Sequence, residues 1–207
     1  MSTIVTALGQ INYLNMLWIF FFVFILHELE EWNIDQFEHQ HFKGLPPAAT
    51  DRSARMWIGF VILVGLVWCA LATLPGDPRL SAWIFLPAIA IMLQNAIQHI
   101  FWSLYFKRYA PGTITSILLV IPFGSYLIAR AVQEGYVPVV YTAVCAAFIL
   151  AGTLQTVRAG SNMTALIRTI NNIGIWLSDR LLKPERIHLE DTQDKPSSSV
   201  VPGENTI

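Results

Sequence analysis

A histidine and a cluster of glutamates stand at the end of the first long apolar run of the chain. His27 precedes Glu30 and Glu31 within the sequence Phe-Ile-Leu-His-Glu-Leu-Glu-Glu-Trp. Since residues three or four positions apart share a helix face, His27 can pair with either glutamate. Ionisable groups beside bilayer hydrocarbon are energetically costly, and membrane proteins that keep them there usually use them. The motif therefore predicts a functional site.

A second polar group interrupts another apolar run. Asn95 and His99 are four positions apart, so they also share a helix face. If the two runs cross the membrane in the same direction, a rise of about 1.5 Å per residue places His27 and His99 within about one helical turn of the same depth. Thr115, near the start of a later run, reaches a similar depth. We expect these side chains to converge in one polar pocket that opens towards the cytoplasmic leaflet.

These residue types suit acid–base catalysis on a lipophilic substrate. A buried carboxyl group holds its proton more tightly than an exposed one and can donate it near neutral pH. We expect Glu30 or Glu31 to be the acid and His27 to orient it. His99, with Asn95, would be the partner base or a positioning group. Such a site could isomerise or cyclise an isoprenoid or sterol-like lipid without a cofactor. Four further residues are expected to contact the substrate: Trp32, Trp57, Trp102 and Thr115.

The same residues also suit a metal site. His27, Glu31 and His99 would supply two imidazole nitrogens and a carboxylate, a set that binds zinc or iron. The stretch from His27 to Glu31 is similar to the H-E-x-x-H pattern of zinc proteases, with glutamate in place of the second histidine. A metal-dependent hydrolase or oxidase is therefore the alternative function. A non-enzymatic lipid-binding or transport protein is a third interpretation. In a purely structural interpretation, Asn95 and His99 only form hydrogen bonds between helices.

The composition is that of an integral membrane protein. Of 207 residues, 54% are hydrophobic and 13% are charged, whereas soluble domains carry about 25% charged residues. The formal net charge is −1, so no basic surface for nucleic acid is expected. Cys69 and Cys145 both lie in apolar runs and are expected to be buried rather than paired. The expected partners are the lipid bilayer and a lipophilic small molecule.

Five apolar segments are long enough to span a bilayer as helices, which takes roughly 20 residues each. Turn and breaker residues separate them, and most connections are short. The expected fold is therefore an all-α bundle of antiparallel neighbours that forms one domain over residues 1–158. The expected spans are residues 13–32, 56–74, 82–106, 113–132 and 138–157.

Positive charges set the expected orientation. With the N-terminus outside, 11 of the 13 Lys and Arg residues fall on the cytoplasmic side. We expect a multi-pass protein of the plasma (inner) membrane with a cytoplasmic C-terminus, in which the first apolar run stays as a span. Residues 159–183 carry apolar positions at helical spacing and are expected to form an amphipathic helix in the cytoplasmic interface. Residues 184–207 are polar, which is typical of a disordered tail.

The motif and its context resemble one known family. His27, Glu30 and Glu31 match the H-x-x-E-E motif that names a family of bacterial membrane proteins. Two later stretches, residues 95–99 and 109–113, are similar to the second polar segment of that family.

The resemblance covers roughly residues 15–155. It implies that the motif residues and His99 belong to one site, and it implies no particular reaction. A looser similarity to small membrane bundles of the sterol-isomerase and terpene-cyclase type favours proton-transfer chemistry.

Overall fold

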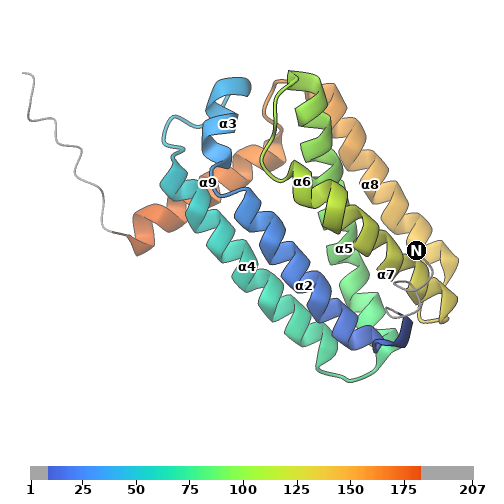
Figure 1. Cartoon of the computed structure of the whole chain (residues 1–207). Helices are drawn as coiled ribbons and strands as arrows, with labels where there is room; N and C mark the ends of the chain where they lie inside the picture. Colours follow the sequence, from blue (N-terminus) through green and yellow to red (C-terminus); the bar gives the residue numbers. More distant parts are fainter. Residues whose placement is uncertain (1–8, 183–207) are drawn as a thin grey trace, which may run out of the picture.

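The computed structural model describes residues 9–182, and apart from one isolated bridge between Lys43 and Asn162 the regular structure in this part of the chain is helical (Figure 1). Five helical segments are long and apolar enough to cross a membrane, as expected for a multi-pass membrane protein. Cys69 and Cys145 are buried and free, also as expected. The elements are α2 (Tyr13–Glu30), α3 (Ile34–His41), α4 (Asp51–Thr73), α5 (Pro78–Phe106), α6 (Thr113–Thr115), the π-helical turn η1 (Ser116–Val120), α7 (Ile121–Gln133), α8 (Val139–Ala159) and α9 (Ala165–Leu181).

Capping residues make the second and third spans begin earlier than expected, while the other span ends lie within two residues of the expected positions. Thr50 caps α4: its hydroxyl accepts from the Ser53 N–H at 3.2 Å, and the Ser53 hydroxyl accepts from the Thr50 N–H at 2.9 Å. Asp77 caps α5 by accepting from the Arg79 N–H at 2.9 Å. Hydrophobicity alone misses these polar first turns.

Two prolines lie inside spans without ending them. Pro87 in α5 has no N–H to donate to the Trp83 carbonyl, and the Tyr141 hydroxyl of α8 donates to that carbonyl at 2.8 Å instead. Pro122 is the second residue of α7, which directly follows η1, and the wider turn of η1 takes up the change in hydrogen-bonding register. Both spans therefore continue through their prolines.

Helix α5 is central and packs against α2, α4, α7 and α8. Helix α9 packs against α4 and runs across the direction of the spans (Figure 1). Buried apolar side chains form two clusters. The larger includes Phe24 and the smaller includes Phe37 and Trp102. Since His27 follows Phe24 by one turn and His99 precedes Trp102 by one turn, the polar residues lie between the two apolar clusters.

Helix α9 occupies only the middle of the expected range 159–183. The Thr164 hydroxyl caps its first turn. The helix lies close against α4, since a Cβ added at Gly174 would lie 2.5 Å from the Ser53 carbonyl oxygen. It therefore covers the end of α4 that faces the polar residues. The expected tail, residues 184–207, lies outside the described residues.

Candidate functional site

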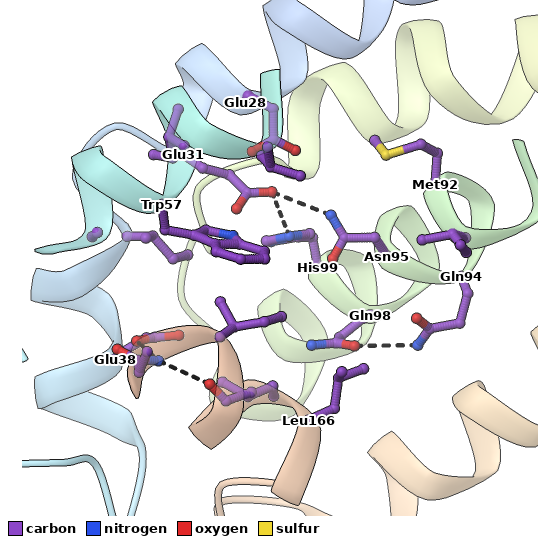
Figure 2. Close-up of a pocket in the computed structure, with 18 of the residues that line it drawn as sticks. Glu28, Glu31, Glu38, Trp57, Met92, Gln94, Asn95, Gln98, His99 and Leu166 are labelled. Atoms are coloured by element: carbon purple, nitrogen blue, oxygen red, sulfur yellow. Dashed lines mark hydrogen bonds and ion pairs between the residues drawn. The ribbon is translucent and has the colours of Figure 1, made fainter. Parts of the chain in front are cut away.

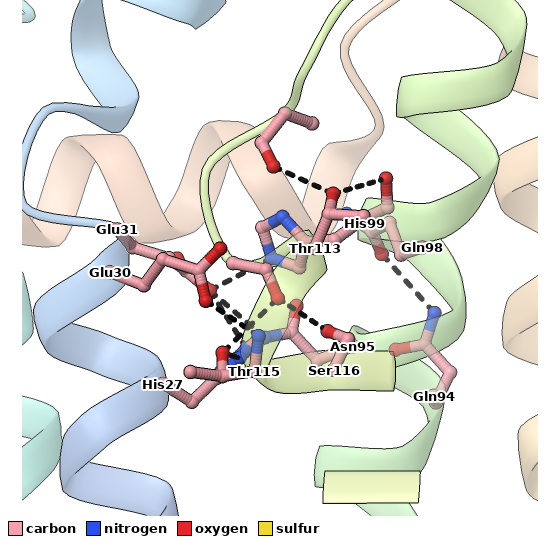
Figure 3. Close-up of polar contacts among 12 residues, drawn as sticks. His27, Glu30, Glu31, Gln94, Asn95, Gln98, His99, Thr113, Thr115 and Ser116 are labelled. Carbon is pink, nitrogen blue, oxygen red and sulfur yellow. Dashed lines mark hydrogen bonds and ion pairs between the residues drawn. The ribbon is translucent and has the colours of Figure 1, made fainter. Parts of the chain in front are cut away.

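Three side chains converge on one carboxylate oxygen (Figure 3). The Oε1 atom of Glu31, directly after α2, lies 3.0 Å from Nε2 of His27 and 2.8 Å from Nε2 of His99. The Asn95 amide nitrogen lies 3.4 Å from the same oxygen and 3.1 Å from Nε2 of His27. Both imidazoles are buried, with 0% and 1% of their surface exposed. We call these four residues the Glu31 cluster; the structure brings together the residues that the sequence placed at one depth.

The imidazoles set the charge of Glu31. Burial by itself would raise the pKa of this carboxyl, but the charges and hydrogen bonds of His99 and His27 outweigh burial and hold the pKa well below its ordinary value. The two imidazoles therefore favour the carboxylate form of Glu31. A carboxylate accepts protons and binds cations, so the geometry does not favour Glu31 as a proton donor.

Thr115 fixes the second nitrogen of His27 (Figure 3). Its hydroxyl oxygen lies 2.8 Å from Nδ1 of His27 and donates to the Gly112 carbonyl at 3.3 Å. Because the hydroxyl proton is used there, we assign the ring proton to Nδ1, which leaves Nε2 of a neutral ring with a lone pair. That lone pair faces the Glu31 carboxylate at 3.0 Å. Two acceptors at this distance require a cation between them, either a second ring proton or a metal ion.

Thr115 is thus not one of the residues that line the cavity described below, although the sequence predicted substrate contact for it. Its hydroxyl points at the imidazole of His27 and orients that ring. Its predicted depth agrees with this contact to His27, and its contact with a substrate stays a prediction.

Glu30 turns away from the Glu31 cluster and anchors the start of the fourth span. Its two carboxylate oxygens accept from the Ile114 N–H at 2.9 Å and from the Thr115 N–H at 2.7 Å, and the Tyr109 hydroxyl also donates to it. These N–H groups lie in the first turn of a helical segment, where they have no helical acceptor and where a carboxylate is favourable. Glu30 therefore fits a structural anchor better than the acid expected from the motif.

The backbone before α6 covers both imidazoles. Gly112 has φ +93°, and a Cβ added there would lie 3.1 Å from Cε1 of His27 and 3.1 Å from Cγ and Nδ1 of His99. Glycine suits this position for two reasons, the left-handed backbone and the lack of space.

A cavity of ≈ 180 Å³ opens beside Glu31 (Figure 2). Trp57 and Trp102, two of the tryptophans expected to contact a substrate, line it. Trp32 does not: its side chain is 42% exposed, and the guanidinium carbon of Arg55 lies 5.3 Å from the centre of its ring. The chain turns directly after α2 and carries the indole outward, so a contact between Trp32 and a substrate stays a prediction.

Two carboxyl groups that the sequence did not single out line the same cavity, those of Glu28 and Glu38. Their residues are only 5% and 7% exposed. Glu28 lies three positions before Glu31, a spacing that puts both on one helix face, so the sequence did contain a signal for it. Glu38 is held by Asn171 of α9, whose amide donates to its carboxyl at 3.1 Å. No local pattern predicts that contact.

Glu38 should make the stability of the protein depend on pH. Burial raises the pKa of its carboxyl from 4.5 to about 7; the hydrogen bond from Asn171 opposes the rise and the charge of Asp35 adds to it. Glu31 also adds to the rise and His99 opposes it. Because the folded protein binds this proton more tightly than the unfolded chain, the stabilisation is fully present below the ordinary pKa and is lost as the pH rises through about 7. We expect a loss of up to about 3 kcal/mol in the free energy of unfolding.

The matched variant is Glu38→Gln, which cannot ionise but keeps an oxygen to accept from Asn171. Thermal unfolding of both proteins in detergent should give similar stability near about pH 5 and a more stable variant near about pH 8. If the variant follows the wild type at both pH values, ionisation of Glu38 carries no penalty in the folded protein.

Comparison with known proteins gives a family match. Residues 18–127, more than half of the chain, match the family model described as a protein of unknown function with HXXEE motif. Over 112 residues the chain is 30% identical to the uncharacterized protein YrkK of Bacillus subtilis (strain 168), a match that covers 53% of this chain and 70% of that protein. No solved structure matches. The matched region includes the whole Glu31 cluster and ends before the limit of 155 suggested by the resemblance.

Proposed function

We propose that this chain, which belongs to the HXXEE-motif protein family, is a membrane enzyme that binds a divalent metal ion through His27, Glu31 and His99. The main support is the convergence of the three ligand atoms. Two imidazole nitrogens and one carboxylate oxygen all lie within 4.8 Å of one another. Such a set suits zinc or iron.

The spacing of these atoms fits a metal ion. Bonds of about 2.0 to 2.2 Å to zinc place neighbouring ligand atoms about 3 to 3.5 Å apart. The Glu31 oxygen lies 2.8 and 3.0 Å from the two Nε2 atoms, so small side-chain movements would complete the site. Thr115 holds Nδ1 of His27 and so supplies the outer hydrogen bond that metal-bound imidazoles usually make. After an amide flip, the oxygen of Asn95 could serve as a fourth ligand.

The groups around the cavity favour hydrolysis. A divalent metal lowers the pKa of a bound water and polarises a carbonyl group. The carboxyl of Glu28 lines the same cavity, and a cation bound at Glu31 would favour its ionised form, which would take a proton from the attacking water. The water oxygen bonds to the carbonyl carbon, the ester or amide bond of the substrate breaks, and Glu28 returns the proton to the leaving group. Glu28 directly follows His27, as the general base follows the first ligand in the H-E-x-x-H pattern.

We place this site in the cytoplasmic half of the plasma membrane, with the N-terminus outside, because the distribution of Lys and Arg favours that orientation. Helix α9 would then be the interfacial helix expected from its sequence. Its exposed apolar side chains, Leu166, Trp176 and Leu181, would enter the lipid headgroup region. A lipophilic substrate would reach the cavity from this side of the bilayer.

Elemental analysis of the detergent-purified protein tests the metal. We expect about one zinc or iron ion per chain, retained through dialysis and lost in His27→Ala. The matched control is His39→Ala, because the His39 side chain is 48% exposed and pairs with Asp35 on α3. A folded wild-type protein that takes up neither metal when both are supplied would refute the metal site.

Proton transfer without a metal is the second candidate, and one observation favours it. Burial raises the pKa of Glu38 to about 7, and its carboxyl lines the cavity, so it can donate a proton near neutral pH. His99 with Glu31 would accept a proton, and an isoprenoid or sterol-like alkene would be isomerised or cyclised without a cofactor. A folded, metal-free protein would leave this candidate, and Glu38→Gln is the variant that removes its acid.

A further inference from the structure

An apolar groove lies beside the polar cavity, among α2, α4 and α5. It encloses ≈ 330 Å³, and every residue that lines it is apolar, glycine or proline. The indole nitrogen of Trp68 donates to the Ile84 carbonyl at 3.1 Å, which holds this ring in the wall. Val64 and Trp68 are each 43% exposed. In a membrane the groove therefore opens towards lipid.

The groove and the cavity lie next to each other and share part of their lining. Gly65 makes room at the junction, since a Cβ added there would lie 2.7 Å from Cε1 of the Phe24 ring. The combined space is apolar along the groove and polar where it reaches Glu31. Four side chains line both parts: Phe24, Val61, Ile91 and Met92.

The polar end selects against an anionic head group. Among the described residues that line the cavity there is no lysine or arginine. Three carboxyl groups line this part, those of Glu28, Glu31 and Glu38, and no cationic side chain is there to pair with a phosphate or a free carboxylate. Side-chain amides instead offer donors and acceptors to a neutral ester or amide group. They belong to Gln94, Asn95 and Gln98.

We infer that the substrate is a single-chain amphiphile, whose hydrocarbon chain lies in the apolar groove and whose neutral ester or amide head reaches Glu31. This inference rests on the proposed hydrolytic function and names its substrate class. Of the four hollows found among the described residues, this groove is the one that shares lining side chains with the cavity, and it would hold one hydrocarbon chain. The hydrocarbon chain of the substrate moves from lipid into an equally apolar groove, so the walls of the groove select the shape of that chain through packing. The polar contacts of the head group then hold the substrate in place.

A photoactivatable monoacylglycerol with a diazirine in its acyl chain tests the groove. On irradiation with the purified protein it should label α2, α4 and α5 saturably. Excess unmodified monoacylglycerol should displace it, and diacyl phosphatidylcholine should not. Ala88→Phe and Val64→Trp, which fill the groove from two helices, should each reduce labelling about tenfold. Ala147→Phe, at an exposed position of α8, should leave labelling unchanged.

Displacement by phosphatidylcholine, or labelling that both groove variants leave intact, would identify an ordinary boundary lipid and overturn the inference. Equal labelling by a fatty acid that carries the same diazirine would overturn the preference for a neutral head. Metal content measured on the same samples separates this inference from the proposed function. Specific labelling of a metal-free protein would refute the metal chemistry alone, whereas bound metal without specific labelling would refute the groove alone.

Discussion

Replacing Glu30 with alanine is expected to lower the free energy of unfolding by about 3 kcal/mol, since each hydrogen bond to a charged group contributes roughly 1.5 to 3 kcal/mol. Glu30 accepts three such bonds, from the N–H groups of Ile114 and Thr115 and from the Tyr109 hydroxyl. Its loss leaves two N–H groups at the start of the fourth span without their acceptor. Because Glu30 is partly exposed, water replaces some of these bonds, and the expected loss is smaller than their sum.

The same change should weaken metal binding, because Thr115 bonds Glu30 through its N–H and His27 through its hydroxyl. Thermal unfolding in detergent measures the loss of stability, and metal titration measures the loss of metal affinity. Glu30→Gln keeps one acceptor oxygen and should lose about half as much stability. Asp179→Ala, at an exposed position of α9, should lose almost none. If Glu30→Ala unfolds at the same temperature as Asp179→Ala, the anchor does not stabilise the fold.

The spans and the centre of the site follow from local patterns. Apolar runs of about 20 residues predict the helices, and the four-residue spacing puts His27 and Glu31 on one face. His99 joins them because α2 and α5 are separated by one intervening span and therefore cross in the same direction. These relations depend only on helix geometry, and the helices themselves can be predicted from the sequence.

The roles of single residues depend on contacts that no local pattern encodes. Glu30 and Glu31 are adjacent, but neighbouring side chains on a helix point about 100° apart, so one reaches the start of α6 and the other reaches α5. Glu38 is enclosed through Asn171, which lies 133 positions away in the sequence. Trp32 lies two residues beyond the end of α2, in a turn, so the direction of its indole does not follow from helix spacing.

Replacing Gly112 with alanine should disturb both imidazoles of the Glu31 cluster at once. At φ +93° a residue with a Cβ is strained by roughly 1 to 2 kcal/mol. The new methyl group would also lie 3.1 Å from atoms of His27 and His99, and such overpacking costs about 1 to 3 kcal/mol. We expect the free energy of unfolding to fall by about 2 to 5 kcal/mol. Metal affinity should fall about tenfold or more, as it does when groups that orient metal ligands are changed.

A Gly135→Ala variant separates backbone strain from the contact between the new methyl group and the imidazoles. Gly135 has φ +68°, and nothing lies within 4 Å of a Cβ added there, so this variant carries the backbone strain without the contact. Both variants should lose stability in thermal unfolding, and only Gly112→Ala should lose metal affinity. The imidazoles can relieve the contact by rotating away from Glu31, although Thr115 resists that rotation at His27. Equal metal affinity in the two variants would mean that the loop moves instead of the rings, and that glycine at position 112 serves the turn alone.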